Sequence, residues 1–286
     1  MSDSSRSLGA ELRFAANRHI FRTMLATSGL AAVLMYRLLP RHHAVLPDRR
    51  TVWSFAKLQA RNLARLCGVE VVVEGLGEIA TGGPFIFTPN HQSHFDIAAL
   101  LGFLPGDNRF AAKTELFADR ILGPVLRTLG MVPIDRDNPT EAIRSLGVLK
   151  GRPVSLIVFP EGTRSEDGSL LPFKKGPFVA AIELGIPVVP VAIRGSAAVM
   201  PKSGRLGIHP GRITIHIDPP IPTRGLSYAD RGQLRDRVRA TIAGHLTEDT
   251  TLPASAGTGV GEPASPGIVH GPAPAHRAEA PDLDHI

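Results

Sequence analysis

Short apolar runs alternate with longer amphipathic stretches along the chain from residue 70 onward. The runs are rich in β-branched residues, which is typical of buried strands. They predict strands at residues 71–74, 84–88, 109–112, 131–134, 154–159, 187–193 and 213–217. Spacing and capping signals predict helices at residues 93–104, 121–129, 140–150, 176–184 and 228–246. This alternation predicts an α/β fold with a central sheet flanked by helices.

The amino-terminal part has a different pattern. Residues 23–36 form an uncharged stretch of fourteen residues with arginines on both sides. The stretch is short for a bilayer span, which needs about 20 residues. A signal peptide is an alternative, although no small-residue cleavage site follows the apolar run. A helix that lies in the membrane interface fits the pattern better.

Residues 52–66 predict an amphipathic helix. Its apolar positions fall within an arc of about 140°, and its basic residues cluster on the opposite side. The apolar positions are Val52, Phe55, Leu58, Leu63 and Leu66, and the basic residues are Lys57, Arg61 and Arg65. One interpretation is an ordinary surface helix that packs on the core. The other is a helix that, with the preceding stretch, seats the protein on anionic lipid with its basic face toward the head groups.

Composition divides the chain into a part that should be globular and a part that should be disordered. Apolar residues make up 43% of it, so a globular body is expected. The part from residue 248 onward is rich in Pro, Ala and Gly without apolar periodicity, which predicts a disordered tail. We therefore expect membrane-associating helices at 1–68, an α/β domain at 69–247 and the tail at 248–286. The single cysteine, Cys67, excludes an internal disulfide.

The charge distribution favours an anionic partner. The net charge is +6, but the tail holds six acidic residues and one basic residue, so residues 1–247 carry +11. Such an excess suits nucleic acid, an anionic membrane surface or phosphorylated substrates. Aromatic residues make up only 5% of the chain, which offers little for stacking bases, so no nucleic acid partner is expected.

The first candidate catalytic residues follow the strand at 84–88, in the sequence NHQSHFD at residues 90–96. If His91 lies in the turn and Asp96 in the first helical turn, the carboxylate can meet the imidazole. That pairing would fix the tautomer and make His91 a general base. Two alternatives remain open: a capping box of Ser93 with Asp96, and a metal held by His91, His94 and Asp96.

A second motif, FPEGTRS at residues 159–165, directly follows the strand at 154–158. Gly162 permits a tight turn, which presents Glu161, Thr163 and Arg164 at the edge of the sheet. Burial of a carboxylate and a guanidinium in one turn is costly unless they pair or meet a polar ligand. An internal ion pair is therefore the alternative to a binding site.

Further cations lie near the ends of predicted elements. Arg136 ends the sequence GMVPIDR and could clamp a phosphate with two hydrogen bonds. Lys113 follows another strand, and Lys174 and Lys175 precede a helix. Solvated surface charge is the alternative for each. No nucleophile motif accompanies His91, so direct attack by a substrate hydroxyl is favoured, which indicates acyl transfer onto a phosphorylated lipid alcohol.

These blocks resemble the glycerolipid acyltransferase family, and most closely its 1-acyl-glycerol-3-phosphate acyltransferases, over approximately residues 50–220. Four blocks occur in the family's order: residues 90–96, the segment ending at Arg136, residues 159–165 and residues 188–191. The second block departs slightly, with Val132 and Pro133 where the family commonly carries bulky hydrophobic or aromatic residues.

The resemblance implies transfer of a fatty acyl group from acyl-CoA or acyl carrier protein to lysophosphatidate, forming phosphatidate. It implies that His91 deprotonates the acceptor hydroxyl and that Asp96 orients the His91 imidazole. Substrate-binding residues are expected at Lys113, Arg136, Glu161, Gly162, Thr163 and Arg164. No cofactor or metal is expected beyond the acyl carrier, and the enzyme is expected at the cytoplasmic face of the cell membrane. Rival functions are a related acyltransferase with another acceptor, a non-catalytic lipid-binding protein and a metal-dependent hydrolase.

Overall fold

A seven-stranded sheet forms the centre of the protein, in the strand order β1-β7-β6-β2-β5-β3-β4. The computed structural model describes residues 9, 11, 13–24, 27, 49–79, 83–120, 122–135, 141, 145, 154–202 and 207–247. Neighbouring strands are parallel except β6 and β7, which are antiparallel. The strands are β1 (Val69–Glu74), β2 (Ile86–Pro89), β3 (Asn108–Lys113), β4 (Val132–Ile134), β5 (Ser155–Ile157), β6 (Val188–Arg194) and β7 (Gly211–Ile217).

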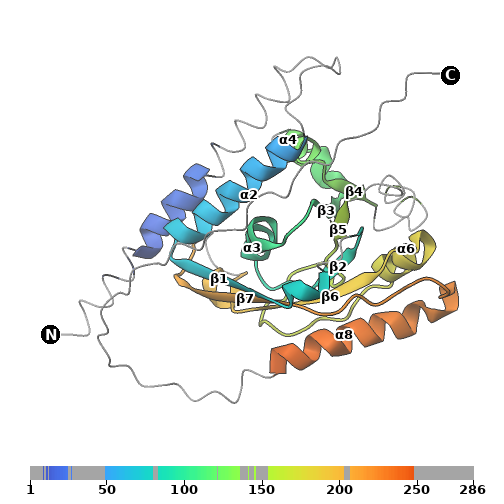
Figure 1. Ribbon diagram of the computed structural model, residues 1–286. Helices are drawn as coiled ribbons and strands as arrows, with labels where there is room; N and C mark the ends of the chain where they lie inside the picture. The colour runs from blue at the N-terminus through green and yellow to red at the C-terminus, as the bar shows by residue number, and fades with distance from the viewer. Residues whose placement is uncertain are drawn as a thin grey trace, which may run out of the picture. The chain divides into compact units, whose positions relative to one another are not determined.

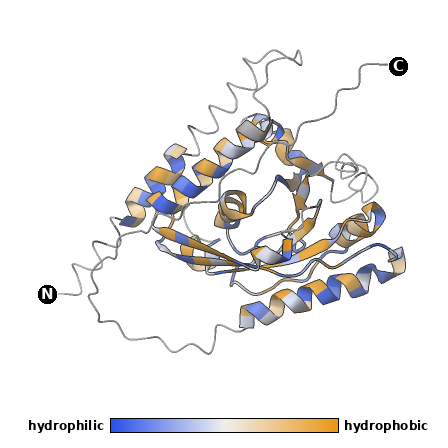
Figure 2. Cartoon of the chain, viewed as in Figure 1, coloured by the Kyte–Doolittle hydropathy of each residue, from blue (hydrophilic) through white to orange (hydrophobic). Residues whose placement is uncertain are grey.

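Helices cover both faces of this sheet (Figure 1). The α-helices are α2 (Arg49–Leu66), α3 (Phe95–Phe103), α4 (Leu122–Thr128), α6 (Gly176–Leu184), α7 (Ser196–Val199) and α8 (Arg231–Thr247), and the 3₁₀ turns are η1 (Leu76–Ile79), η2 (Thr114–Phe117) and η4 (Tyr228–Asp230). One core cluster joins α2 and α3 to the sheet, and a second joins α6 and α8 to its other face. In Figure 2 the central strands are mostly apolar, whereas α8 carries many polar positions.

The predicted α/β fold is confirmed. Each predicted strand corresponds to an observed strand, and the helices predicted at 93–104, 121–129, 176–184 and 228–246 correspond to α3, α4, α6 and α8. Most of the helix predicted at 140–150 lies outside the described residues, and so does the tail. The domain boundaries after residues 68 and 247 stay predictions.

The amino-terminal helix of residues 13–24 is tied to the domain by Asn17. Its buried amide donates hydrogen bonds to the carbonyl oxygens of Cys67 at 3.0 Å and Ile208 at 2.9 Å. Apart from residues 23, 24 and 27, the uncharged stretch at 23–36 lies outside the described residues. None of the helices within the described ranges has both the length and the apolarity to cross a membrane.

The structure supports the first interpretation of α2, a helix that packs on the core, because Trp53, Leu63 and Ala64 belong to a core cluster. The expectation that Lys57 and Arg61 face lipid head groups is wrong. Lys57 Nζ donates hydrogen bonds to the carbonyl oxygens of Leu104 at 3.0 Å and Gly106 at 2.7 Å. Arg61 Nε donates to the carbonyl oxygen of Gly102 at 2.7 Å. Lys57 and Arg61 therefore reach the carboxyl end of α3, where carbonyl groups lack helical partners and attract cations, whereas Arg65 is exposed.

Three large apolar side chains of α2 are exposed. Phe55 is 50% exposed, and Leu58 and Leu66 are each 54% exposed. Trp53 and Ala60 are buried instead. A hydrophobic arc identifies the buried side of a helix only when the neighbouring element offers an apolar surface, and here the end of α3 offers carbonyl groups as well.

Candidate active site

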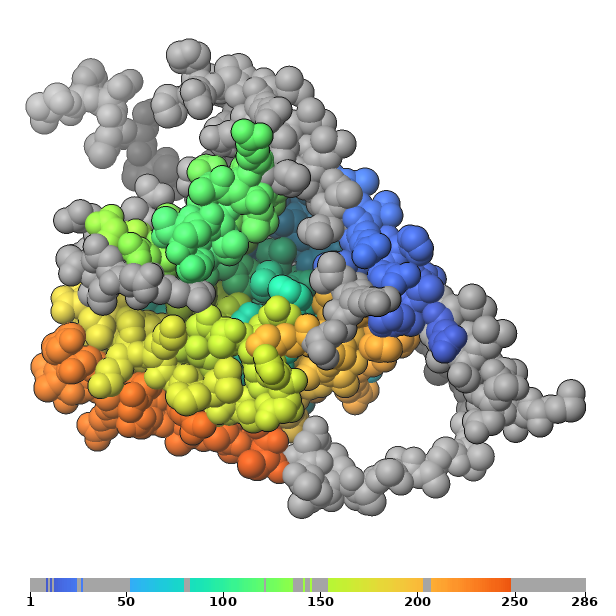
Figure 3. All heavy atoms as spheres, turned by 180° about the vertical axis from the view of Figure 1, so that it is seen from behind, coloured from blue at the N-terminus to red at the C-terminus, as the bar shows by residue number. Residues whose placement is uncertain are grey.

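The candidate residues gather where parallel strands end. His91 comes just after β2 and Glu161 just after β5, and these two strands are adjacent and parallel. Asn90 fixes the backbone between β2 and His91, because its side chain exchanges two hydrogen bonds with Ile193 of β6, at 3.0 and 2.7 Å. The carboxyl edge of such a sheet is the usual position of a ligand site. Figure 3 shows a recess in the surface there, with atoms of the β2–α3 region in teal at its floor and the yellow-green loop after β5 beside it.

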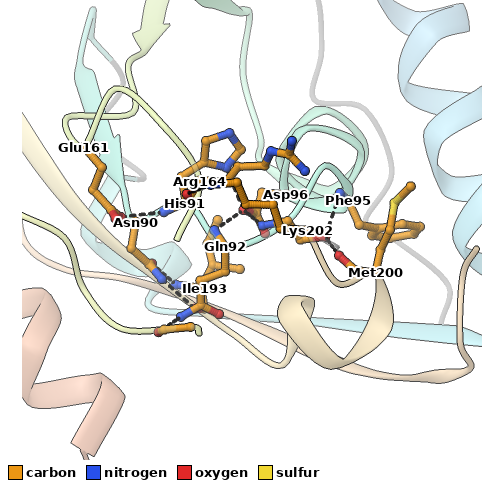
Figure 4. A network of polar contacts seen from close by, with 12 residues as sticks. Asn90, His91, Gln92, Phe95, Asp96, Glu161, Arg164, Ile193, Met200 and Lys202 are labelled. Carbon is orange, nitrogen blue, oxygen red and sulfur yellow. Dashed lines mark hydrogen bonds and ion pairs between the residues drawn. The ribbon is translucent and has the colours of Figure 1, made fainter. Parts of the chain in front are cut away.

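His91 and Asp96 form a hydrogen-bonded pair. His91 Nδ1 lies 2.8 Å from Asp96 Oδ2, and the Asp96 side chain is fully buried. An ionised carboxylate only accepts hydrogen bonds, so the imidazole proton lies on Nδ1. Nε2 is then the basic nitrogen, on the side of the ring away from Asp96 (Figure 4).

Asp96 also holds the turn that precedes α3. Its Oδ2 accepts the backbone N–H groups of Gln92 and Ser93, each at 2.8 Å. The predicted pairing with His91 and the Asp96 half of the predicted capping box thus share one oxygen atom. The other half of the box is not formed, because Ser93 Oγ accepts the N–H of Phe95 and the N–H of Asp96 goes to the Ser93 carbonyl. Asp96 Oδ1 is buried without a hydrogen-bond partner among the described residues. Ser93 completes the turn, because its Oγ accepts from Phe95 N at 3.0 Å and donates to the Met200 carbonyl at 2.7 Å.

Glu161 holds two loops together. Its Oε1 accepts the backbone N–H of His91 at 2.7 Å, and its Oε2 accepts that of Leu171 at 3.1 Å. Burial raises the pKa of the Glu161 carboxyl to about 7, although the two N–H groups act in the opposite direction. Within the described ranges Glu161 makes no ion pair with Arg164, so the internal-pair alternative is not what the structure contains.

Phe159 supports the imidazole from one face. The two rings are stacked with centroids 3.8 Å apart and planes inclined by 18°. The His91 carbonyl accepts the N–H of Ser165 at 2.8 Å, which connects the ends of both motifs. The sequence contained Phe159 within its second motif, but an aromatic residue at a strand end is equally typical of the core, so its role at His91 was missed.

The turn after β5 requires a glycine. Gly162 has φ of +72°, and an added Cβ would lie 2.9 Å from Cε of Lys174. The turn leaves Thr163 exposed and Arg164 half-buried. Lys202 Nζ holds this segment by donating to the Arg164 carbonyl at 2.9 Å. The Arg164 backbone is thereby fixed beside His91 (Figure 4).

Among the described residues, the Arg164 guanidinium makes no hydrogen bond or ion pair, and only the carbonyl of this residue is engaged. The positive charge of Arg164 acts on His94. Burial of His94 lowers its pKa most, and the charge of Arg164 lowers it further. A half-buried cation beside the imidazole is available for an anionic ligand.

The other candidate residues lie apart from this group. Lys113 ends β3, at the same sheet edge, and its exposed ammonium pairs with Glu115 at 2.8 Å. Arg136 lies outside the described residues. The structure therefore brings together His91, Asp96, Glu161, Gly162 and Arg164, with Thr163 in the same turn. Burial raises the pKa of the Cys67 thiol to about 11, so Cys67 supplies no thiolate nucleophile.

Comparisons with known proteins identify similar sequences. The family model described as Acyltransferase matches residues 70–194. The protein named 1-acyl-sn-glycerol-3-phosphate acyltransferase alpha from Ovis aries is 33% identical over 199 residues, which cover 68% of this chain and 69% of the relative. The protein of the same name from Homo sapiens is 32% identical over 199 residues, covering 68% and 70%.

A solved structure is also similar. The crystal structure of the 1-acyl-sn-glycerophosphate (LPA) acyltransferase PlsC from Thermotoga maritima superposes with a TM-score of 0.69 at 30% identity. The match covers 87% of this chain and 100% of that chain.

Proposed function

The chain belongs to the 1-acyl-sn-glycerol-3-phosphate acyltransferase family, and on that premise we propose that it acylates lysophosphatidate to phosphatidate. The observation that carries the proposal is the contact of 2.8 Å between His91 Nδ1 and buried Asp96, beside the guanidinium of Arg164. A base next to an anion-binding side chain suits an acceptor that has both a hydroxyl and a phosphate. The acyl donor in this proposal is a thioester of coenzyme A or acyl carrier protein.

The proposed reaction is a direct transfer. The acceptor hydroxyl gives its proton to Nε2 of His91 as its oxygen attacks the thioester carbonyl carbon. The new C–O bond forms and the C–S bond breaks, and the departing thiolate recovers the proton from the imidazolium. Asp96 stabilises that imidazolium through Nδ1, and Phe159 keeps the ring in plane.

Substrate binding is proposed for the motif after β5. Arg164 pairs with the acceptor phosphate, with Arg136 and Lys113 as further cations and Thr163 as a hydroxyl donor. Gly162 leaves room for the acceptor to approach the turn. Glu161 acts through the backbone, because both of its oxygens already hold N–H groups, so we propose it as a positioning residue.

We also propose that the protein works on a membrane, at its cytoplasmic face. The substrate has a long acyl chain, and the outward side of α2 exposes Phe55, Leu58 and Leu66. Apolar side chains on a helix surface enter the interface between head groups and acyl chains. Arg65, exposed on the same helix, can meet anionic head groups.

A panel of acceptors tests the proposed substrate. The purified full chain is incubated with one acyl-CoA and, in turn, lysophosphatidate, glycerol-3-phosphate, lysophosphatidylcholine and a lyso-glycolipid, and the acylated products are quantified. The proposal expects phosphatidate as the main product, with kcat/KM for lysophosphatidate at least tenfold above that for every other acceptor. A higher kcat/KM for another acceptor would assign the site to a related acyltransferase.

A further inference from the structure

A second group of chemically active side chains lies on the opposite face of the sheet from α3. Ile213, Ile215 and Ile217 of β7 face the core cluster that contains α3. Successive side chains of a strand point to opposite faces, so His216 faces the side covered by α8. His245, in the last turn of α8, lies against it, and the two imidazole centroids are 3.8 Å apart.

Asp218 joins the two histidines. Its Oδ1 lies 3.0 Å from His245 Nε2 and 3.9 Å from His216 Nε2. One ligand atom from each of the three residues falls within 4.8 Å of the others. Two imidazole nitrogens and a carboxylate oxygen therefore converge on one position, and these are the donor atoms that zinc-class metals prefer.

In the part of the chain that the structure describes, only one oxygen of the Asp218 carboxylate has a hydrogen-bond partner. Asp218 Oδ2 is buried and has no hydrogen-bond partner among the described residues, which is costly for a charged group. The residue as a whole is 9% exposed. An ion held between the carboxylate and the imidazoles would compensate this buried charge.

The surroundings suit a metal in a further respect. His216 Nδ1 lies 3.1 Å from Glu74 Oε2 of β1, so a proton on Nδ1 is held there and Nε2 keeps its lone pair for a ligand bond. A carboxylate on the remote nitrogen is the common second contact of a metal-bound histidine. The side chains of His216 and His245 are 28% and 21% exposed, so an ion and a completing water can reach them.

We propose that His216, Asp218 and His245 bind a divalent transition metal of the zinc class, with Glu74 as the residue that orients His216. Tetrahedral zinc bonds place ligand atoms about 3.3 Å apart. Binding therefore requires the 3.9 Å edge between His216 and Asp218 to contract and the 3.0 Å edge between His245 and Asp218 to open slightly. One cation contacts the group: Arg194 Nη1 donates to the His245 carbonyl at 3.3 Å. The two negative charges of Glu74 and Asp218 exceed its single positive charge. The metal fastens the end of α8 to β7 and β1, away from the His91 site.

The test is zinc affinity, measured on the metal-stripped full chain in competition with a chromophoric chelator. Cobalt(II) absorption reports the geometry, because a tetrahedral site gives strong visible bands. The variants are His245→Ala and Asp218→Asn, and the matched control is His209→Ala, an exposed histidine outside the group. Circular dichroism checks that each variant is folded.

We expect one zinc per chain, and a tetrahedral cobalt spectrum, in the wild type and His209→Ala. His245→Ala and Asp218→Asn should lower the affinity at least about 100-fold, and Glu74→Gln about 10- to 100-fold. Zinc should raise the Tm of the wild type but not that of His245→Ala. Equal zinc affinity in the wild type and both group variants, an octahedral cobalt spectrum, or no binding would overturn the proposal. Because Asp218→Asn preserves shape, loss of fold in His245→Ala alone would not decide the outcome.

Discussion

His91 Nδ1 and the backbone N–H groups of Gln92 and Ser93 all bind the same oxygen of Asp96, each at 2.8 Å. The carboxylate that orients the imidazole therefore also holds the turn before α3. Its position is set by the local backbone, so the imidazole is held in one orientation before any substrate binds. Such preorganisation is what general-base catalysis requires.

Replacement Asp96→Asn separates the two roles of this residue. Asparagine caps a helix about as well as aspartate, so α3 should persist and the Tm should change little. The imidazolium loses its negative partner, so kcat should fall about 10²- to 10⁴-fold. Steady-state kinetics and thermal unfolding measure both effects, and Asp236→Asn, on the exposed side of α8, is the control. Full activity in Asp96→Asn would leave Asp96 as a cap alone.

Replacement Arg164→Ala should act on the acceptor. The KM for lysophosphatidate should rise at least about tenfold, while the KM for acyl-CoA changes less than twofold, because only the acceptor carries its phosphate to this guanidinium. Arg164→Lys should recover little, since an ammonium cannot make the planar two-point contact. Arg237→Ala, exposed on α8, is the control. Equal changes for donor and acceptor would give Arg164 a structural role.

Glu161 makes the stability of the protein depend on pH. Its carboxyl pKa is about 7 in the fold, above the ordinary value of 4.5, so between these values the folded state binds more protons than the unfolded state. Stability should therefore fall as pH rises from about 4.5 through 7. Denaturant titrations of the wild type and Glu161→Gln should show that the variant lacks this part of the decline. Parallel curves over the whole range would show that the carboxyl titrates normally.

The two sides of α2 should respond differently to mutation. Lys57→Met leaves the carbonyl groups at the end of α3 without their cation, so the free energy of unfolding should drop by about 1–3 kcal/mol. Phe55→Ser with Leu58→Ser should keep stability within about 0.5 kcal/mol, because these side chains are exposed, yet weaken liposome sedimentation severalfold. Undiminished liposome binding in the double variant would mean that the protein reaches its lipid by another surface.

Local sequence signals identified much of this architecture. The β-branched runs located the strands because buried parallel strands need continuous apolar sequence. His91 and Asp96 could be paired because a turn before a helix brings positions five apart together. The placement of Lys57 and Arg61 could not be inferred, since their partners are carbonyl groups at the end of α3, which no pattern within α2 reveals.

The other features that the sequence did not predict are contacts between residues far apart in the chain. Glu161 reaches the amide of His91 across 70 positions, and that contact depends on β2 and β5 being neighbours. The same limit applies to His216, Asp218 and His245, because 27 residues separate the last two and only the packing of α8 brings them together. Phe159 was visible in its motif, but its stacking on His91 follows from strand order.

The release of thiol from acyl-CoA, measured with and without lysophosphatidate, shows whether His91 serves as the base for acyl transfer. We expect rapid release by the wild type only when lysophosphatidate is present, with one phosphatidate formed per thiol. In His91→Ala the release should fall about 10²- to 10⁴-fold while circular dichroism shows a folded protein. Release that proceeds equally without lysophosphatidate, or that persists undiminished in His91→Ala, would contradict acyl transfer by a His91 base.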